Sequence, residues 1–190
     1  MDADGGQLQK LETPAPSIHL AVMWTPEGRL AWQQYTDQSS SYMNFRIRDL
    51  KTGDERFLAT PTTSGWMFYP FFSPTGDRTA FRWNNRSGTS GIWTAAWPDG
   101  TPRFLANESR RPIGWSHDGN AVFAAELLEE RPVISRIDAA SGKATDLTTL
   151  PVGVIVGGTA SRDGRTLVVT VQEQTGDAWL LEHLNPKSKQ

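Results

Sequence analysis

The stretch Ser73-Pro74-Thr75-Gly76 separates two apolar segments and has three counterparts elsewhere in the chain. These are Thr25-Pro26-Glu27-Gly28, Ser116-His117-Asp118-Gly119 and Ser161-Arg162-Asp163-Gly164, which lie about 45 residues apart. Each residue type suits a tight turn, because proline presets φ, serine or aspartate caps the turn through its side chain, and glycine adopts the positive φ that closes it. A turn that returns at this interval indicates a repeat protein.

A second series of turns lies between the members of the first. Its members are Asp4-Gly5, Thr52-Gly53, Asp99-Gly100 and Ser141-Gly142. The last three follow the nearest turn of the first series by about 24 residues, so the two series stay in phase along the chain. Chance similarity would not keep two turn types at a constant offset, and the phasing therefore supports a structural repeat.

Short apolar segments fill the intervals between the turns. They are four to seven residues long, rich in β-branched and aromatic residues, and bounded by Gly, Pro, Asn, Asp or Ser, which is typical of strands. Each unit of about 45 residues accommodates four such strands, the period and strand count of a β-propeller blade. The best helical alternative, residues 121–130, is followed closely by Pro132 and fits the same strand pattern.

The repeat predicts an all-β single domain over residues 1–190, a β-propeller of about four four-stranded antiparallel blades that form an open arc or a fragment of a larger propeller. Its expected parts are a stray outer strand in residues 1–12, blades at 13–60, 61–106, 107–150 and 151–184, and a tail at 185–190. The fourth blade lacks its last strand. Either the N-terminal strand completes that blade as a clasp, or the chain is a piece of a larger ring. We favour the piece, because Met1 falls where a third strand would end.

Charge and composition exclude several classes of function. Lysine and arginine total 19 against 21 aspartates and glutamates, so there is no basic excess to neutralise a nucleic-acid backbone. No apolar run approaches the length of a membrane span, and the N-terminal residues carry no apolar core of the kind that a signal peptide needs. We therefore expect neither a nucleic-acid partner nor membrane insertion, while a periplasmic and a cytoplasmic location both stay open.

Metal and catalytic chemistry find little support in the residue types. The chain has no cysteine, and its three histidines fall at unrelated blade positions, so we expect no metal and no cofactor. Residues 114–119, which contain Ser116, His117 and Asp118, resemble the G-x-S-x-G nucleophile elbow of a hydrolase. Adjacent side chains cannot form a catalytic triad, however, because the members of a triad converge from separate strands. The same residues also lie in register with the other turns. We therefore expect no catalytic residue and no enzymatic activity in this chain.

Recognition is expected at the end of the blades that carries the variable loops. In a four-stranded meander the first and third connections share one end, so the second connections and the links between blades share the other. The repeated turns occupy the first end, whereas the loops at the second end differ among the units and are the expected carriers of binding. Amide, guanidinium and aromatic groups suited to a protein or peptide partner, with a small ligand as the alternative, come there from Trp66, Asn84, Asn85, Arg86, Arg110 and Arg111.

Seven of the eight tryptophans fall into two groups. Five of them occupy repeated strand positions and are expected to pack between neighbouring blades, because a buried indole removes a large apolar area from water. These are Trp24, Trp83, Trp93, Trp115 and Trp179. Trp66 and Trp97 lie in or beside loops, where a partner would be needed to cover them.

The units resemble TolB-type repeats, a WD-repeat-like β-propeller family of bacterial proteins. That family combines Ser-Pro-Asp-Gly with a short Ala-Phe strand, an Asp-Ile-Trp strand and Asp-x-x-Gly-Gly. The matching residues here are Ser73-Pro74-Thr75-Gly76, Ala80-Phe81, Ile92-Trp93, Asp177-Ala178-Trp179 and residues 1–6. The chain departs from the pattern at Thr25, Glu27 and Arg162, where the family has Ser, Asp and Pro.

The resemblance covers nearly the whole chain and implies a fold more firmly than a function. It implies a non-catalytic scaffold or module that binds a protein, peptide or other ligand, for example the regulatory and sensor part of a larger bacterial protein such as a serine/threonine kinase or a winged-helix regulator. Two alternatives stay open. One is the propeller lid of a prolyl oligopeptidase-like serine peptidase whose catalytic domain lies outside this chain, and the other is a carbohydrate-binding propeller.

Overall fold

The computed structural model describes residues 19–35, 42–58, 65–84, 88–107, 109–126, 131–151, 153–161, 163 and 165–173. Over these residues the chain is all β, with fourteen strands and no helix. Accordingly, the described part of the chain contains no helix that is long and apolar enough to cross a membrane. The strands expected at residues 7–12 and 178–181 lie outside the described residues.

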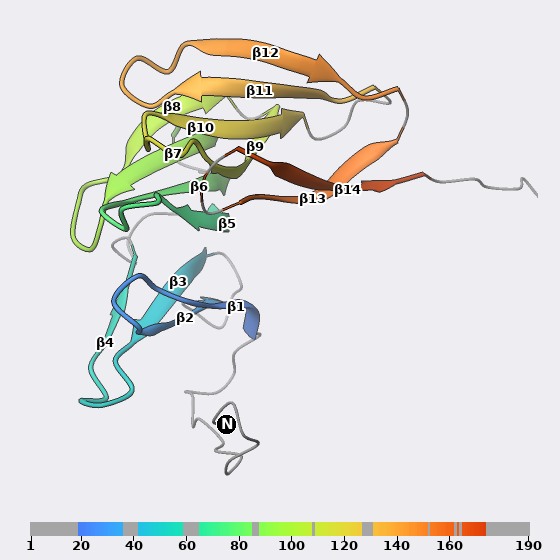
Figure 1. Cartoon of the computed structure of the whole chain (residues 1–190). Coiled ribbons are helices and arrows are strands. Elements are labelled where there is room, and N and C mark those ends of the chain that lie inside the picture. The colour runs from blue at the N-terminus through green and yellow to red at the C-terminus, as the bar shows by residue number, and fades with distance from the viewer. Residues whose placement is uncertain are drawn as a thin grey trace, which may run out of the picture.

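The strands follow one another as antiparallel meanders, which we name blades 1 to 4, with strands A to D in chain order (Figure 1). Blade 1 contains β1 (His19–Trp24), β2 (Leu30–Tyr35), β3 (Tyr42–Arg48) and β4 (Glu55–Phe57). Blade 2 contains β5 (Gly65–Phe72), β6 (Arg78–Asn84), β7 (Gly91–Ala96) and β8 (Arg103–Asn107). Blade 3 contains β9 (Arg110–Trp115), β10 (Ala121–Glu126), β11 (Val133–Asp138) and β12 (Ala144–Thr149). Blade 4 contains β13 (Val154–Ala160) and β14 (Leu167–Gln172).

This arrangement is a partial β-propeller, which confirms the predicted fold class. Blade 3 is a sheet of its own, with the order β12-β11-β10-β9, and β13 pairs only with β14 among the described strands. Blades 1 and 2 are joined more closely than the repeat alone predicts. β3 pairs in parallel with β5 at Tyr42–Gly65 and Met43–Trp66, so the two blades share one sheet.

The A–B turns are closed by their own side chains. In blade 3 the N–H of Ser116 donates to the carbonyl of Ala121 at 2.9 Å, and the Ser116 hydroxyl accepts the N–H of Ala121 at 2.9 Å. The same hydroxyl donates to Asp118 Oδ1 at 2.6 Å. Ser161 and Asp163 repeat this contact in blade 4 at 2.5 Å. One serine hydroxyl therefore fixes both the end of strand A and the start of strand B.

Blade 2 builds the same turn with a different carboxylate. Thr75 stands where blade 3 has Asp118, and the acceptor is instead Asp77, two residues further along the chain. The hydroxyls of Ser73 and Thr75 donate to Asp77 Oδ1 at 2.8 and 2.5 Å. These two hydrogen bonds lower the pKa of Asp77, with that of Thr75 as the larger cause.

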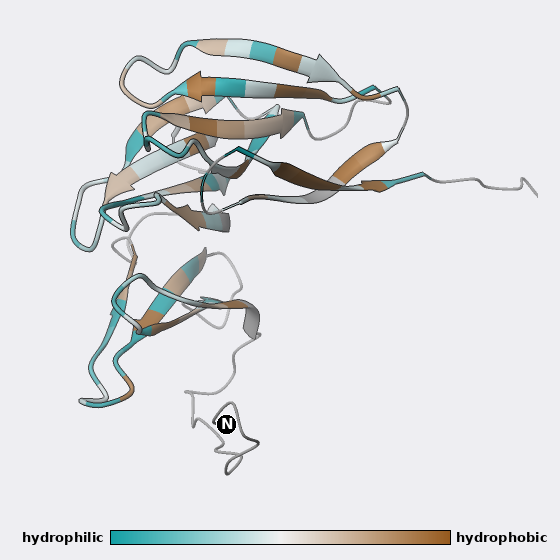
Figure 2. Cartoon of the chain, viewed as in Figure 1, coloured by the Kyte–Doolittle hydropathy of each residue, from teal (hydrophilic) through white to brown (hydrophobic). Residues whose placement is uncertain are grey.

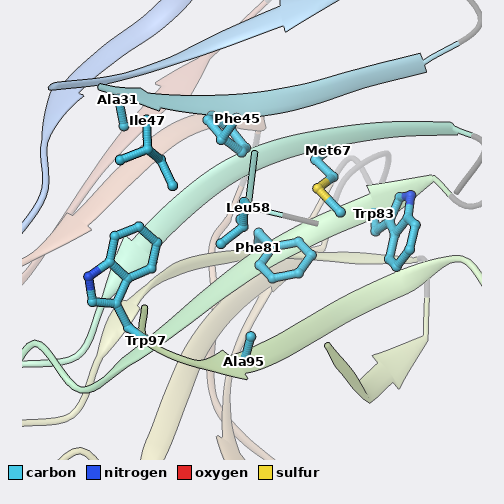
Figure 3. Packing of buried hydrophobic residues seen from close by; sticks show 9 residues of the cluster. All are labelled: Ala31, Phe45, Ile47, Leu58, Met67, Phe81, Trp83, Ala95 and Trp97. Carbon is cyan, nitrogen blue, oxygen red and sulfur yellow. The ribbon is translucent and has the colours of Figure 1, made fainter. Parts of the chain in front are cut away.

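Apolar side chains fill the spaces between neighbouring blades. Figure 3 shows the cluster between blades 1 and 2, where Phe45 and Ile47 of β3 face Phe81 of β6 and Trp97. Further clusters lie between blades 2 and 3 and between blades 3 and 4. Successive residues of β6 serve two interfaces, because Phe81 belongs to the first cluster and Ala80 to the second. Figure 2 accordingly shows hydrophobic residues concentrated on the strands, where hydrophilic residues lie between them, and few hydrophobic residues in the turns.

Three of the tryptophans expected between blades are found there, whereas the expectation that Trp97 needs a partner to cover it is wrong, because Trp97 is only 9% exposed and belongs to the cluster between blades 1 and 2. Trp83 and Trp115 are buried between blades, and Trp93 packs against the first cluster. The expectation for Trp24 is wrong. It is the last residue of β1, and 62% of it is exposed, because Met23 and not Trp24 packs against the cluster between blades 1 and 2. Trp179 lies outside the described residues.

Candidate functional site

Two of the predicted binding residues lie where β5 begins and β6 ends. Trp66 is partly buried and meets Phe68 edge to face, with the ring centroids 6.3 Å apart. Asn84 lies opposite Trp66 in the β5–β6 register and accepts a hydrogen bond from the Ser90 hydroxyl at 3.3 Å. The structure thus brings Trp66 and Asn84 together. Asn85 and Arg86 lie outside the described residues.

The two neighbouring arginines, Arg110 and Arg111, point in different directions because β9 begins at the first of them. Arg110 forms ion pairs with Glu126 at 3.7 Å and with Asp146 at 3.5 Å inside blade 3. Only 4% of Arg111 is exposed, and its guanidinium donates to the carbonyl of Ile155 in blade 4. The structure therefore places Arg111 inside the interface between blades 3 and 4 and not on the loop surface.

A hollow of 460 Å³ opens at the other end of the blades, where the four A strands end. Its lining comes from the last residues of β1, β5, β9 and β13 and from the A–B turns that follow three of these strands. The lining residues are Trp24, Thr25, Pro26, Phe71, Phe72, Ser73, Pro74, Thr75, Gly76, Gly114, Trp115, Thr159, Ala160 and Ser161. In Figure 1 the hairpin turns at this end lie on the left of the molecule.

The lining combines aromatic rings with hydroxyl groups, and none of the lining residues that the structure describes is ionisable. The hydroxyls also have structural duties. Those of Ser73 and Thr75 donate to Asp77, and that of Ser161 donates to Asp163. Thr25 Oγ1 accepts the backbone N–H of Arg29 at 3.1 Å. The protons of three of these hydroxyls are thus committed to carboxylates, so what these groups offer to a ligand is oxygen lone pairs.

Trp24 is the aromatic residue of the hollow with the most free surface. Trp115 also lines the hollow but is buried, and its Nε1 donates to the carbonyl of Phe71 at 2.9 Å. The Arg78 guanidinium lies over the Trp115 ring at 5.2 Å from the centroid, so that ring is already covered. Trp24 therefore presents the largest apolar surface that a bound molecule could cover at this end.

The Ser116-His117-Asp118 stretch is a turn in the structure. The Ser116 hydroxyl bonds directly to Asp118 Oδ1 and to the Ala121 backbone, and His117 is exposed beside it. This is not the geometry of a triad, in which the histidine stands between the nucleophile and the acid. Across the residues that the structure describes, no group of three or more His, Asp or Glu is placed to hold a metal ion.

Sequence reasoning directed attention to the loop end and missed the hollow. A signal for it was present, since the A–B turns recur at one end of every unit and the A strands of a propeller are the innermost ones. Four such strand ends must converge around the axis. That convergence makes residues such as Trp24, Phe71 and Thr159 neighbours although they are far apart in the sequence.

Comparison with known proteins relates the chain to propellers by structure alone, since no family model and no curated protein sequence matches it. It resembles the putative TolB from Agrobacterium tumefaciens, with 24% identity and a TM-score of 0.66 over 83% of this chain and 55% of that one. TolB from Acinetobacter baumannii is 22% identical, with a TM-score of 0.63 over 85% of this chain and 39% of that one. An acylaminoacyl peptidase in complex with Z-Gly-Gly-Phe-chloromethyl ketone is 16% identical, with a TM-score of 0.57 over 84% of this chain and 28% of that one.

The chain thus spans little more than half the length of the A. tumefaciens protein and less of the other two. The fold is shared by TolB proteins and by a peptidase, so it identifies no activity. What the likeness shows is the architecture: the chain has the fold of a partial β-propeller of the kind found in TolB.

Proposed function

We propose that the chain is a non-catalytic TolB-like β-propeller module that binds a protein or peptide, and that it serves as the regulatory or sensor part of a larger bacterial protein. The observation that carries the proposal is the hollow at the ends of the four A strands. Its 460 Å³ falls within the volume range of ligand sites, which are concave.

The chemistry of the lining supports binding over catalysis. General acid–base catalysis needs an ionisable side chain at the reacting atoms, and the described residues of the lining include none. Nucleophilic catalysis needs a hydroxyl beside a base that activates it. The Ser73 and Ser161 hydroxyls instead donate to Asp77 and Asp163, and these hydrogen bonds close the A–B turns of their own blades. An uncharged lining with an exposed indole instead suits an uncharged side chain of a peptide, with Trp24 as the anchor.

A peptide selection tests this proposal. The full chain is used to select binders from a phage-displayed library of random peptides, and each binder is then measured against two variants. We expect Trp24→Ala to weaken binding at least about tenfold, since truncating a hot-spot tryptophan costs 2 kcal/mol or more. Trp66→Ala is the matched control, because Trp66 lies at the loop end of β5.

The outcomes separate the two ends of the molecule. Binding lost in Trp24→Ala and kept in Trp66→Ala supports the hollow as the site. The reverse pattern assigns binding to the loop end, where Trp66 and Asn84 lie. A selection that yields no binder, together with saturable quenching of tryptophan fluorescence by neutral sugars, favours the carbohydrate-binding alternative.

The likeness to the acylaminoacyl peptidase favours a second candidate, a propeller lid over a serine peptidase. The complete reading frame distinguishes the two candidates. An α/β-hydrolase segment downstream of this propeller favours the lid, whereas a kinase or winged-helix segment upstream favours the sensor.

A further inference from the structure

The outer strand of blade 3, β12, differs from the other described outer strands in its length and exposure. It spans six residues, against three in β4 and five in β8, and all six of its side chains are exposed. β12 ends the order β12-β11-β10-β9, so its outer edge pairs with no other described strand, and Figure 1 shows it as the outermost ribbon. Such an edge is a row of unpaired N–H and C=O groups that can pair with another chain.

The other two outer strands each carry an arginine, which β12 lacks. In β4, Glu55 and Arg56 both form ion pairs, with Arg46 at 2.6 Å and with Asp99 at 3.0 Å. β8 begins with Arg103, whose guanidinium lies against the next blade. β12 reads Ala-Thr-Asp-Leu-Thr-Thr and contains no Lys, Arg or Pro. Its one charged residue, Asp146, accepts a hydrogen bond from Ser135 at 2.8 Å and pairs with Arg110 at 3.5 Å inside blade 3. β12 therefore lacks the lysine and proline that natural sheets use to keep their edges from pairing.

Leu147 in β12 shows the same difference at a single position. Leu58 and Leu105 stand at the equivalent place in blades 1 and 2, five residues after the turn glycine, and are 9% and 5% exposed. Leu147 is 49% exposed. Leu147 also has no pairing partner in β11, because the register shifts there: Ile134 pairs with Thr148, and the next residue, Ser135, pairs with Asp146.

We propose that β12 pairs antiparallel with β12 of a second copy of this chain. When Asp146 stands opposite Leu147 of the copy, Thr145 stands opposite Thr148 and Ala144 opposite Thr149, and the two-fold axis makes each pair twice. No like charges then face each other, and cross-strand threonine pairs are favourable. Leu147 gains the strand partner that β11 does not supply. The two blade 3 sheets become one continuous sheet, and pairing along this edge stops at the dimer because each copy contributes one β12.

Charged residues placed opposite each other across the two-fold axis, at positions 145 and 148, test this register. Glutamate suits position 145, because Arg136 of β11 lies opposite Thr145 within the same chain. The variant Thr145→Glu/Thr148→Glu puts like charges opposite each other twice, whereas Thr145→Glu/Thr148→Lys puts opposite charges there. Thr170→Lys is the control, because Thr170 is exposed on β14, away from β12.

The mass in solution is measured for all four proteins as a function of concentration by light scattering, up to about 1 mM chain, the range of weak association. We expect a monomer–dimer equilibrium for the native chain and for Thr170→Lys. The double-glutamate variant should weaken dimerisation about tenfold, and the Glu/Lys variant should restore it. A native chain that stays monomeric, aggregates that grow beyond the dimer, or two double variants that behave alike would each overturn the proposal.

Discussion

Asp118 is the most perturbed carboxylate of the A–B turns. The Ser116 hydroxyl, the backbone N–H of Asn120 and the Asn120 amide all donate to it, at 2.6, 3.0 and 3.2 Å. These contacts, above all that of Ser116, lower its pKa from the ordinary 3.8 to about 2. The bonds are made to the charged form, so the turn is held most firmly when Asp118 is ionised.

The pH dependence of stability follows from that shift. The native carboxylate binds its proton more weakly than the unfolded one, so the stabilisation is complete above about pH 4 and is lost as the pH falls towards 2. We expect Asp118→Asn to be less stable than the native chain at pH 7 and to lose less stability on acidification. Urea unfolding at a series of pH values measures both effects. Ser116→Ala, which removes the main donor, should raise the Asp118 pKa in a carboxyl NMR titration. An unchanged pKa would contradict this account.

Gly114 is a residue at which even one methyl group should be costly. A Cβ there would lie 2.6 Å from Ala160 Cβ and 2.9 Å from Ala160 N, between β9 and β13. We expect Gly114→Ala to lower the free energy of unfolding by about 1–3 kcal/mol more than Gly53→Ala, because overpacking adds to the cost of positive φ. Gly53 has φ +79° with nothing within 4 Å of the added Cβ, so it isolates the backbone cost. Equal losses in thermal or urea unfolding would show that β9 and β13 are not packed this closely.

Single residues also show where sequence reasoning succeeds and where it stops. The turn glycines and serines are predictable, since their bonds join residues within one short stretch. The burial of Arg111 is not, because its partner Ile155 lies 44 residues away in another blade. The exposure of Trp24 likewise depends on what covers one face of β1, which no local pattern encodes.

At the level of elements, outer strands are fastened to the following blade by arginines at a repeated position. Arg56 of β4 donates to the carbonyl of Pro98 at 2.6 Å and lies over the Trp97 ring at 4.9 Å. Arg103 of β8 donates to the carbonyl of Ala140 at 3.2 Å in the turn of blade 3. Both arginines stand three residues after the turn glycine. The repeat in sequence is thus also a repeat of contacts between blades.

Replacing the guanidinium should loosen this contact. We expect Arg56→Lys to lower the free energy of unfolding by about 1–2 kcal/mol, because lysine cannot stack on Trp97 and reach two acceptors together. Arg165→Lys, at an exposed position in the blade 4 turn, should change it by less than about 0.5 kcal/mol. Chemical denaturation of the two variants gives the comparison, and equal values would remove the role assigned to Arg56.

The elements themselves are largely predictable from the sequence. Strands with turn residues at both ends, such as β6 and β10, appear where the pattern places them, because their apolar residues and their turns are local signals. The parallel pairing of β3 with β5 at Met43–Trp66 is not predictable in this way. It joins two blades at residues whose alternation is equally compatible with separate sheets.

Across the whole molecule, burial decreases from the middle blades towards blade 4. β10 is buried along five of its six residues, whereas β14 is exposed at four of six. In repeat proteins stability is a sum of unit and interface contributions, so an exposed unit opens first. We expect amides of residues 154–172 to exchange with deuterium faster than those of residues 110–126 in hydrogen-exchange mass spectrometry. Uniform protection of the two segments would indicate a single cooperative unit.

The same scale explains why the lining of the hollow escapes sequence analysis. The repeated A–B turns indicate the end of the blades at which the hollow lies, but they do not identify its lining, which comes from four blades and includes Trp24, Phe71, Trp115 and Thr159. Composition and period predict a ring-like arrangement of sheets, and they leave open which side chains the ring gathers at its axis. That depends on the angle between blades, which is set by packing between residues about 45 positions apart.

The relocated carboxylate of blade 2 has a consequence for how such proteins are found. Asp77 satisfies Ser73 from a place two residues beyond the one that Asp118 occupies relative to Ser116. When the two turns are aligned residue by residue, blade 2 has Thr75 in place of the aspartate, although Ser73 still donates a hydrogen bond to a carboxylate. The units can therefore differ in amino-acid sequence at the turn while they keep the hydrogen bond that closes it. Comparing the hydrogen bonds that close the turns therefore relates units of this chain that a residue-by-residue alignment does not.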